Sequence, residues 1–200
     1  MKAGVRALGV ADSYRGDRSI LAGAVVTVAR GVDGVWFASC TVGGLDATEG
    51  VRTMVRDLDR EDVQYLFLSG IAPAWFNVYD LRELADAVGL PVLSISFEAS
   101  EGLSDAIADA FDGEERQRRL ERYEAQPARH PVDVNDERVY VRSVGFAEED
   151  PATVVRAFTP VGGRPEPLRV ARLAARGVDR FRHREGPGAW STAPGEDPGA

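Results

Sequence analysis

The chain has 200 residues, 44% of them hydrophobic, and a formal net charge of −8 at pH 7, which suits one domain with a substantial core. Its single cysteine, Cys40, excludes an internal disulfide and any cysteine-cluster metal site such as a zinc finger. No apolar run approaches the roughly 20 residues of a membrane span, and residues 1–6 lead into no signal core, so we expect a cytoplasmic protein without membrane contact.

Three strand-like runs open the chain, at residues 5–10, 19–28 and 35–42. The dipeptide Asp33-Gly34 predicts a turn between the second and third runs. Strands joined by short hairpins are antiparallel. The sequence therefore predicts an antiparallel three-stranded unit at the start of the domain.

Helices and strands then alternate along the chain. The pattern predicts helices at 47–58 and 80–88 and strands at 63–68 and 91–97, with Gly89 ending the second helix. A helix between two strands provides a crossover connection. We therefore expect the two later strands to lie parallel to a neighbour in the same sheet and to be covered by helices.

The second half of the chain is less sharply patterned. Pro127 and Pro131 predict a loop at 126–135, in which His130 is an exposed residue. We expect one domain over 1–180, followed by a disordered acidic tail rich in Pro and Gly over 181–200. The remaining predicted elements are helices at 104–110, 114–124, 151–158 and 165–176 and a strand at 137–144.

The last predicted helix carries a basic stripe. Pro165 suits its first turn and Gly177 its end. Residues 164–184 contain seven arginines and two acids, a local charge of +5 against −13 for the rest of the chain. This asymmetry favours a polyanion-binding surface, but arginines paired with the protein's own carboxylates explain it equally well. The spacing of three and four places these residues on one helix face: Arg169, Arg172, Arg176 and Arg180.

Two aspartates follow strands and could hold a divalent metal. Asp12 follows the first strand, although an Asx turn into Ser13 is a competing role. Asp46 follows the third strand, but its spacing to Glu49 is that of a helix capping box. A carboxylate has about four acceptor sites, so capping and metal binding do not exclude each other.

A glycine-containing loop, 69–80, follows the strand at 63–68, in the position where open α/β sheets bind ligands. Trp75 in this loop could stack on a base, but core packing is the commoner role for an aromatic residue beside a buried strand. Asp80 and Glu83 have capping-box spacing. The sequence lacks both a Lys-containing phosphate loop and a Gly-x-Ser-x-Gly elbow, so nucleotide and serine hydrolases are excluded.

Several short motifs follow one another along the chain. They are Leu8-Gly9-Val10-Ala11-Asp12, Gly44-Leu45-Asp46-Ala47-Thr48, Gly70-Ile71, Phe76-Asn77-Val78-Tyr79-Asp80-Leu81, Gly89-Leu90-Pro91-Val92, Tyr140-Val141 and Pro165-Glu166-Pro167-Leu168-Arg169-Val170-Ala171. In this order, the motifs resemble those of the endonuclease dU family, archaeal proteins related to endonuclease V. The resemblance covers about residues 5–177 and implies an RNase H-like α/β fold: a mixed sheet of three antiparallel and then two parallel strands, flanked by helices.

The resemblance further implies an endonuclease that uses Mg²⁺ or Mn²⁺ to cut phosphodiesters near deaminated bases, uracil or hypoxanthine. Asp12 and Asp46 match its first two acidic positions and are the expected metal ligands and catalytic residues. We expect the nucleic acid, DNA rather than RNA, to be bound by Trp75 and the arginine stripe. The expected binding residues are Arg169, Arg172, Arg176 and Trp75, and the supporting ones are Ser69, Asn77 and Asp80.

The sequence departs from the family pattern at two positions. Ser69 stands where relatives have Asp before Gly-Ile, and Arg172 stands where relatives carry His or Asp. Two unit charges about 4 Å apart attract each other by about 4 kcal/mol at an effective dielectric constant near 20. Losing one carboxylate therefore removes an attraction of several kcal/mol to a divalent ion. The alternatives are therefore an inactive nucleic-acid-binding protein on the same fold and an interaction scaffold.

Overall fold

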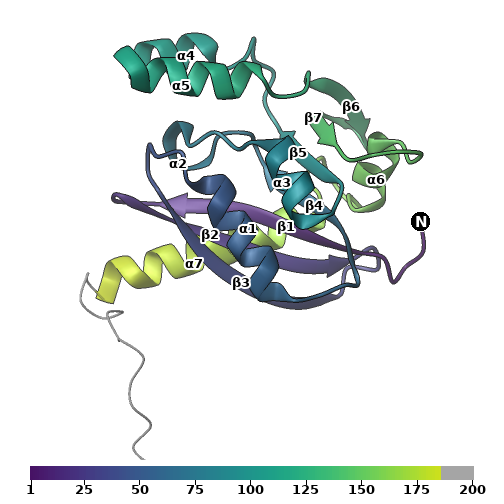
Figure 1. Cartoon of the computed structure of the whole chain (residues 1–200). Coiled ribbons are helices and arrows are strands. Elements are labelled where there is room, and N and C mark those ends of the chain that lie inside the picture. Colours follow the sequence, from purple (N-terminus) through teal and green to yellow (C-terminus); the bar gives the residue numbers. More distant parts are fainter. Residues whose placement is uncertain (186–200) are drawn as a thin grey trace, which may run out of the picture.

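Seven strands form one mixed sheet in the computed structural model, which describes residues 1–185 (Figure 1). Their order across the sheet is β3-β2-β1-β4-β5-β7-β6. The first three strands are antiparallel neighbours, β4 lies parallel to β1, and β5 lies parallel to β4. The predicted α/β fold with three antiparallel and then two parallel strands is confirmed. The strands are β1 (Arg6–Tyr14), β2 (Arg18–Thr27), β3 (Val32–Thr41), β4 (Val63–Ser69), β5 (Val92–Ser96), β6 (His130–Val134) and β7 (Glu137–Val144).

Helices cover both faces of this sheet. In Figure 1, α1 and α3 lie on the near face, and α7 crosses behind the first strands. Within residues 1–185, no helix is long and apolar enough to cross a bilayer. The helices are α1 (Ala47–Leu58), the short α2 (Pro73–Phe76), α3 (Leu81–Val88), α4 (Ser104–Ala110), α5 (Gly113–Glu124), α6 (Pro151–Ala157) and α7 (Glu166–Glu185).

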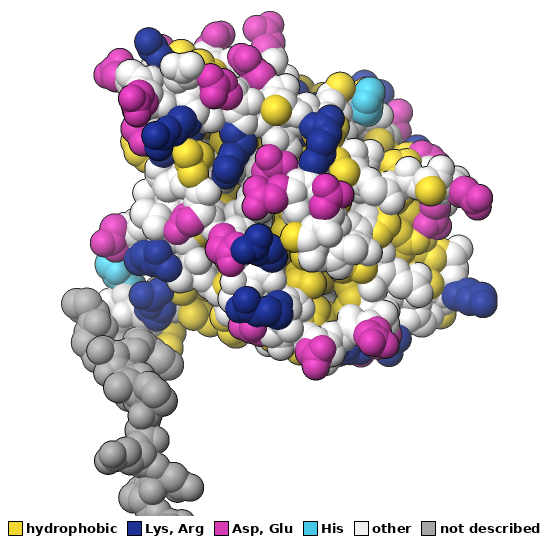
Figure 2. Space-filling model, in the orientation of Figure 1, with side chains coloured by type: hydrophobic (Ala, Val, Ile, Leu, Met, Phe, Trp, Pro, Cys, Tyr) yellow, Lys and Arg dark blue, Asp and Glu magenta, His cyan; other side chains and the backbone are white. Residues whose placement is uncertain are grey.

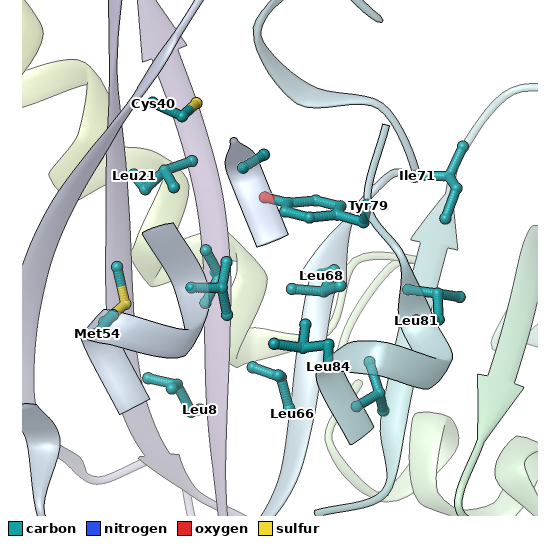
Figure 3. Close-up of a cluster of buried hydrophobic side chains, with 14 of the residues drawn as sticks. Leu8, Leu21, Cys40, Met54, Leu66, Leu68, Ile71, Tyr79, Leu81 and Leu84 are labelled. Atoms are coloured by element: carbon teal, nitrogen blue, oxygen red, sulfur yellow. The ribbon is translucent and has the colours of Figure 1, made fainter. Parts of the chain in front are cut away.

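The main core fills the space between the sheet and helices α1 and α3. Leu8, Leu66 and Leu68 project from β1 and β4 towards Met54 on α1 and Leu84 on α3 (Figure 3). All five side chains are almost completely buried. Each such burial stabilises the fold by about 1.5–3 kcal/mol relative to an exposed side chain. This core holds β1 and β4 side by side, so that the carboxyl ends of these two parallel strands lie next to each other.

Helix α7 packs against the opposite face of β1 because that face is made of small residues. Gly9 lies so close to Pro167 that a side chain on Gly9 would overlap the Pro167 backbone. One strand repeat further on, Ala11 belongs to the same buried cluster as Ala171. This register brings the middle of α7 alongside the end of β1.

The predicted end of the last helix at Gly177 is wrong. The helix continues to Glu185, and Asp179 accepts hydrogen bonds from Ser13 and Arg15, both at 3.1 Å, so tertiary contacts hold the second half of α7 to the sheet. Residues 181–185 are accordingly helical and do not belong to the predicted tail. The rest of that tail, 186–200, lies outside the described residues.

Two turn predictions also need correction. Asp33-Gly34 lies inside β3, and the chain reverses earlier, where Arg30 adopts a φ of 72°. The predicted loop at 126–135 contains β6, which includes His130 and Pro131. The sheet tolerates the proline because β6 is an edge strand, where a missing N–H costs little.

We expect Gly9→Ala to lower the free energy of unfolding by about 2–3 kcal/mol, because the added Cβ would lie 2.5 Å from the carbonyl oxygen of Pro167 and push α7 away. Gly177→Ala is the matched control. Nothing lies within 4 Å of a Cβ at Gly177, so this change should stabilise the helix by about 0.5–1 kcal/mol. Urea unfolding measures both, and equal effects of the two changes would contradict the proposed contact.

Candidate functional site

Asp12 lies near the end of β1, in a pocket at the carboxyl edge of the sheet. The pocket has a volume of about 310 Å³. Its wall includes Ser69 from the end of β4 and Arg172 and Arg176 from α7. Because β1 and β4 are parallel, their ends meet at one edge of the sheet. The structure therefore brings together four of the predicted site residues, Asp12, Ser69, Arg172 and Arg176, from three separate segments of the chain.

A left-handed turn in α2 faces the Asp12 carboxylate. The N–H of Ala74 donates to Asp12 Oδ2 at 2.9 Å. Ala74, Trp75 and Phe76 have φ values of 46°, 57° and 61°, a conformation that residues other than glycine seldom adopt. Strain of this kind costs about 1–3 kcal/mol per residue and is concentrated at functional sites. Here the turn directs a backbone donor at the half-buried Asp12 carboxylate.

Burial raises the pKa of Asp12 above its ordinary value of 3.8. Hydrogen bonding from Ala74 and the positive charge of Arg172 act in the opposite direction but do not cancel the effect of burial. A carboxylate in this state is stabilised by any additional cation that approaches it. Asp12 is therefore a poorly compensated acid beside two guanidinium groups.

Asp46 is held by hydrogen bonds at the end of β3. Its carboxylate accepts from the N–H of Thr41 at 3.0 Å, from the Thr41 hydroxyl at 2.8 Å and from Asn77 Nδ2 at 2.7 Å. Although burial acts to raise the pKa of Asp46, these bonds outweigh it and lower the pKa below 3.8. Asp46 is thus stabilised as an anion without a metal.

The buried side chain of Asn77 does the capping that the sequence assigned to Asp46. Its Oδ1 accepts from the N–H of Ala47, the first residue of α1, at 2.9 Å. Asp46 makes no side-chain capping bond, so the capping-box prediction for this residue is wrong. Asn77 Nδ2 also donates to the Thr41 carbonyl at 2.8 Å. Asn77 lies 30 residues from the helix that it caps, and sequence spacing carries no signal for such a contact.

The charges of both predicted acids act on the Cys40 thiol. Burial, and next the charges of Asp46 and Asp12, raise the pKa of the Cys40 thiol to about 12. Asp46 is not part of the wall of the Asp12 pocket. Asp46 Oδ2 also accepts from the N–H of Thr41, at 3.1 Å, so about four acceptor sites are in use and a cation bound by Asp46 must displace one of its present donors.

The predicted basic stripe divides into two parts. Arg169 donates to Glu166 at 2.5 and 2.7 Å, so it is neutralised by the protein's own carboxylate. Arg172 and Arg176 line the Asp12 pocket, and within residues 1–185 neither forms an ion pair. Figure 2 shows acidic and basic side chains interspersed on the face that carries α1 and α3. Two unpaired arginines of the stripe therefore lie at the pocket.

The remaining predicted site residues have different surroundings. Trp75 is 48% exposed and packs on Phe111 at 4.9 Å between ring centroids, so of its two possible roles the structure does not place it in the core. Asp80 caps α3 by accepting from the N–H groups of Arg82 and Glu83, as its spacing predicted. It lines a separate pocket with α5 and is not a wall residue of the Asp12 pocket.

Arg119, which no sequence motif indicated, supports the glycine turn after β3. This arginine is 2% exposed, donates to the Gly43 carbonyl and lies over the ring of Phe111, 3.9 Å from its centroid. Gly43 in turn packs under Trp75. Arg119 occurs in a helix of alternating charges, where its sequence context is that of a solvent-exposed residue.

The oxygen donors of the pocket suit a single divalent cation held by one or two carboxylates, and not a metal centre built on a cluster of carboxylates. Within residues 1–185, no group of three or more His, Cys, Asp or Glu side chains could hold a metal. Mg²⁺ commonly binds through one or two carboxylates, with water and substrate phosphate completing the shell. Asp12 fits this role because burial leaves its charge uncompensated. Ser69 and Arg172 contribute no negative charge.

The strand order and the helices on both faces define an α/β protein with an RNase H-like fold. A crystallised protein of unknown function from Archaeoglobus fulgidus superposes with a TM-score of 0.77 at 25% identity, covering 86% of this chain and 97% of that one. Ciona intestinalis endonuclease V, solved with an inosine-containing DNA, gives a TM-score of 0.59 at 13% identity, covering 88% and 87%. The second likeness shows the fold alone.

The family model for endonuclease dU matches residues 3–179. A UPF0215 protein of Methanopyrus kandleri is 35% identical over 188 residues, covering 90% of this chain and 94% of its own. The chain therefore belongs to the endonuclease dU family, and the resemblance found in its motifs is confirmed. Family membership and the endonuclease V-like fold support a nuclease-type function.

We expect Asp12→Asn to raise the free energy of unfolding at neutral pH, because the amide oxygen still accepts from Ala74 and the buried charge is removed. A raised carboxyl pKa means that the folded state binds the proton more tightly, so stability falls as pH rises through that pKa. The gain from Asp12→Asn should therefore shrink as pH falls towards 3.8. Urea unfolding at a series of pH values, in EDTA, measures it.

Asp46→Asn is the matched control, and we expect it to lower the free energy of unfolding at neutral pH. The pKa of Asp46 is lowered, so its contribution is present at neutral pH and is lost as pH falls through the folded pKa. We expect a loss of roughly 1 kcal/mol, a value reduced for the partial exposure of this carboxylate. If both variants shift stability in the same direction at neutral pH, the contrast between the two environments is refuted.

Proposed function

We propose that this protein is a metal-dependent endonuclease that cuts nucleic acid near deaminated bases, uracil or hypoxanthine, in the cytoplasm. The observation that carries the proposal is the placement of Asp12, a half-buried acid with a raised pKa, in a pocket walled by Arg172 and Arg176. One acid beside two unpaired guanidinium groups suits a scissile phosphate and the cation that accompanies it. Membership of the endonuclease dU family supports the same reaction class.

The residues of the pocket would divide the work as follows. Arg172 and Arg176 bind the phosphate oxygens and hold the strand across the end of β1. Asp12 would hold Mg²⁺ or Mn²⁺, with Asp46 joining through water or by giving up the Thr41 hydroxyl. When bound, the ion lowers the pKa of a water molecule and neutralises phosphate charge. Hydrolysis joins a water oxygen to phosphorus and breaks one phosphorus–oxygen ester bond, giving one phosphate end and one hydroxyl end.

Trp75 supplies a surface for an unpaired base. Its indole is half exposed, and a strained turn holds it in place above Gly43. Stacking of a base on such a ring is worth about 1–3 kcal/mol and does not depend on the sequence of the strand. Selection of a damaged base requires that the base leave the helix stack, which is cheapest at a mismatched or deaminated site. We infer that DNA is the preferred strand.

A second candidate, favoured by Ser69 and Arg172, is a protein that binds nucleic acid without cutting it. Both positions lack the carboxylate or imidazole expected from the family pattern, and the described residues contain no three-membered acidic cluster. This protein would keep the same binding face and would bind equally well in EDTA. The two candidates differ in whether the protein produces a cut strand.

Cleavage is tested with oligonucleotides that contain one deoxyinosine or one deoxyuridine, incubated with Mg²⁺ or Mn²⁺. We expect a single cut near the modified base and no cut in the unmodified strand. Asp12→Asn should lower the rate by about 10²-fold or more, since it removes the only carboxylate of the pocket wall. Undiminished cleavage by Asp12→Asn would reject its role, and binding without cleavage by the wild type would favour the second candidate.

The salt dependence of binding tests the basic face separately from catalysis. Each phosphate contact contributes about 0.7 to the slope of log K against log salt for single strands and about 0.9 for duplexes. Replacing Arg172 and Arg176 by Gln should therefore lower the slope by about 1.4–1.8. Arg169→Gln is the control on the same helix and should change the slope less, because Glu166 already neutralises Arg169. Equal effects per arginine would show that the pocket is not the contact surface.

A further inference from the structure

A second pocket opens at the same edge of the sheet, next to the one that holds Asp12. It has a volume of about 300 Å³ and lies at the carboxyl ends of β4 and β5. The two pockets share Ser69 and Arg172 in their walls. Three more arginines line the second pocket: Arg129, Arg142 and Arg164. None of these three was predicted to bind anything.

These three guanidinium groups lie over aromatic rings. Within residues 1–185, none of the three forms an ion pair with Asp or Glu. A ring face orients the guanidinium group but leaves its net charge in place. The pairs, with the distance from the guanidinium carbon to the ring centroid, are Arg164 and Phe97 at 3.6 Å, Arg129 and Tyr140 at 4.6 Å, and Arg142 and Tyr123 at 5.1 Å.

Arg164 has a donor that nothing in the described residues satisfies. Its Nη1 atom is buried and has no hydrogen-bond partner there. Burial, and next the positive charges of Arg172 and Arg176, lower the pKa of Arg164. Buried donors without an acceptor are rare in native proteins because the lost hydration is not replaced. A bound anion in the pocket would provide both the acceptor and the missing negative charge.

We propose that this pocket binds the phosphate group of a phosphomonoester, at the end of a nucleic-acid strand or on a free nucleotide. A monoester carries about −1.5 to −2 charges near neutral pH and offers three terminal oxygens, whereas a backbone diester carries only one charge. Four guanidinium groups in one wall match the monoester better. The exposed Glu98 is the acidic residue of that wall, and the arginines outweigh it.

Arg164 is the residue to change, because Arg129 and Arg142 also support the backbone and Arg172 belongs to the Asp12 pocket as well. Arg129 donates to the Ser100 carbonyl and Arg142 to the Pro127 carbonyl, so their loss would disturb the neighbouring loops. Among the described residues, Arg164 makes no such bond. Arg164→Gln removes its charge while keeping much of its volume. Arg56→Gln on α1, at an exposed position, is the control for the change in net charge.

Titration calorimetry in EDTA, at fixed ionic strength, tests the proposal without any cleavage. The probes are a short oligothymidylate with a 5′-phosphate, the same strand with a 3′-phosphate, the same strand with hydroxyl ends, and thymidine 5′-monophosphate. We expect a strand with a terminal phosphate to bind about tenfold or more tightly than the hydroxyl strand. Arg164→Gln should abolish this preference, and Arg56→Gln should retain it.

The possible outcomes separate the source of the phosphate from the proposal itself. Mononucleotide binding as tight as strand binding identifies a free nucleotide, and tighter strand binding identifies a strand end; both support the site. Equal affinity of the wild type for phosphate and hydroxyl ends overturns it, even if Arg164→Gln fails to fold. A preference that survives in folded Arg164→Gln also overturns it. Loss of cleavage activity leaves these binding results unchanged, so the two proposals fail separately.

Discussion

The close contact between α7 and β1 determines where the chemistry of this protein lies. Gly9 admits the backbone of Pro167, and Ala11 packs in the same cluster as Ala171. This register carries Arg172 and Arg176 to the end of β1, beside Asp12. A larger side chain at Gly9 would move the helix and its charges together. The small residues between α7 and β1 therefore also determine where the positive charges of the pocket lie.

The charge distribution follows from which arginines are paired. A chain with a net charge of −8 has enough carboxylates to neutralise its arginines, and Arg169 is neutralised in this way. At the carboxyl edge of the sheet, aromatic rings take the place of carboxylates, as under Arg164. The result is a local positive potential on an acidic protein, which attracts a polyanion to one edge and repels it elsewhere.

Local signals in the sequence predicted most elements of this fold. The helix at Ala47–Leu58 and the parallel strands were found because apolar periodicity and caps such as Asp80 are properties of neighbouring residues. The failures involve contacts between distant segments. Gly177 looks like a helix end until Asp179 is seen bonded to Ser13, and the capping of α1 by Asn77 and the arginine pocket likewise depend on the tertiary fold.

The hydrogen bonds of Asn77 couple two loops mechanically. One side chain holds the Thr41 carbonyl, the Asp46 carboxylate and the N–H of Ala47, while its backbone continues directly from the turn that carries Trp75. One amide side chain therefore joins the turn that carries Trp75 to the carboxylate at the end of β3 and to the start of α1.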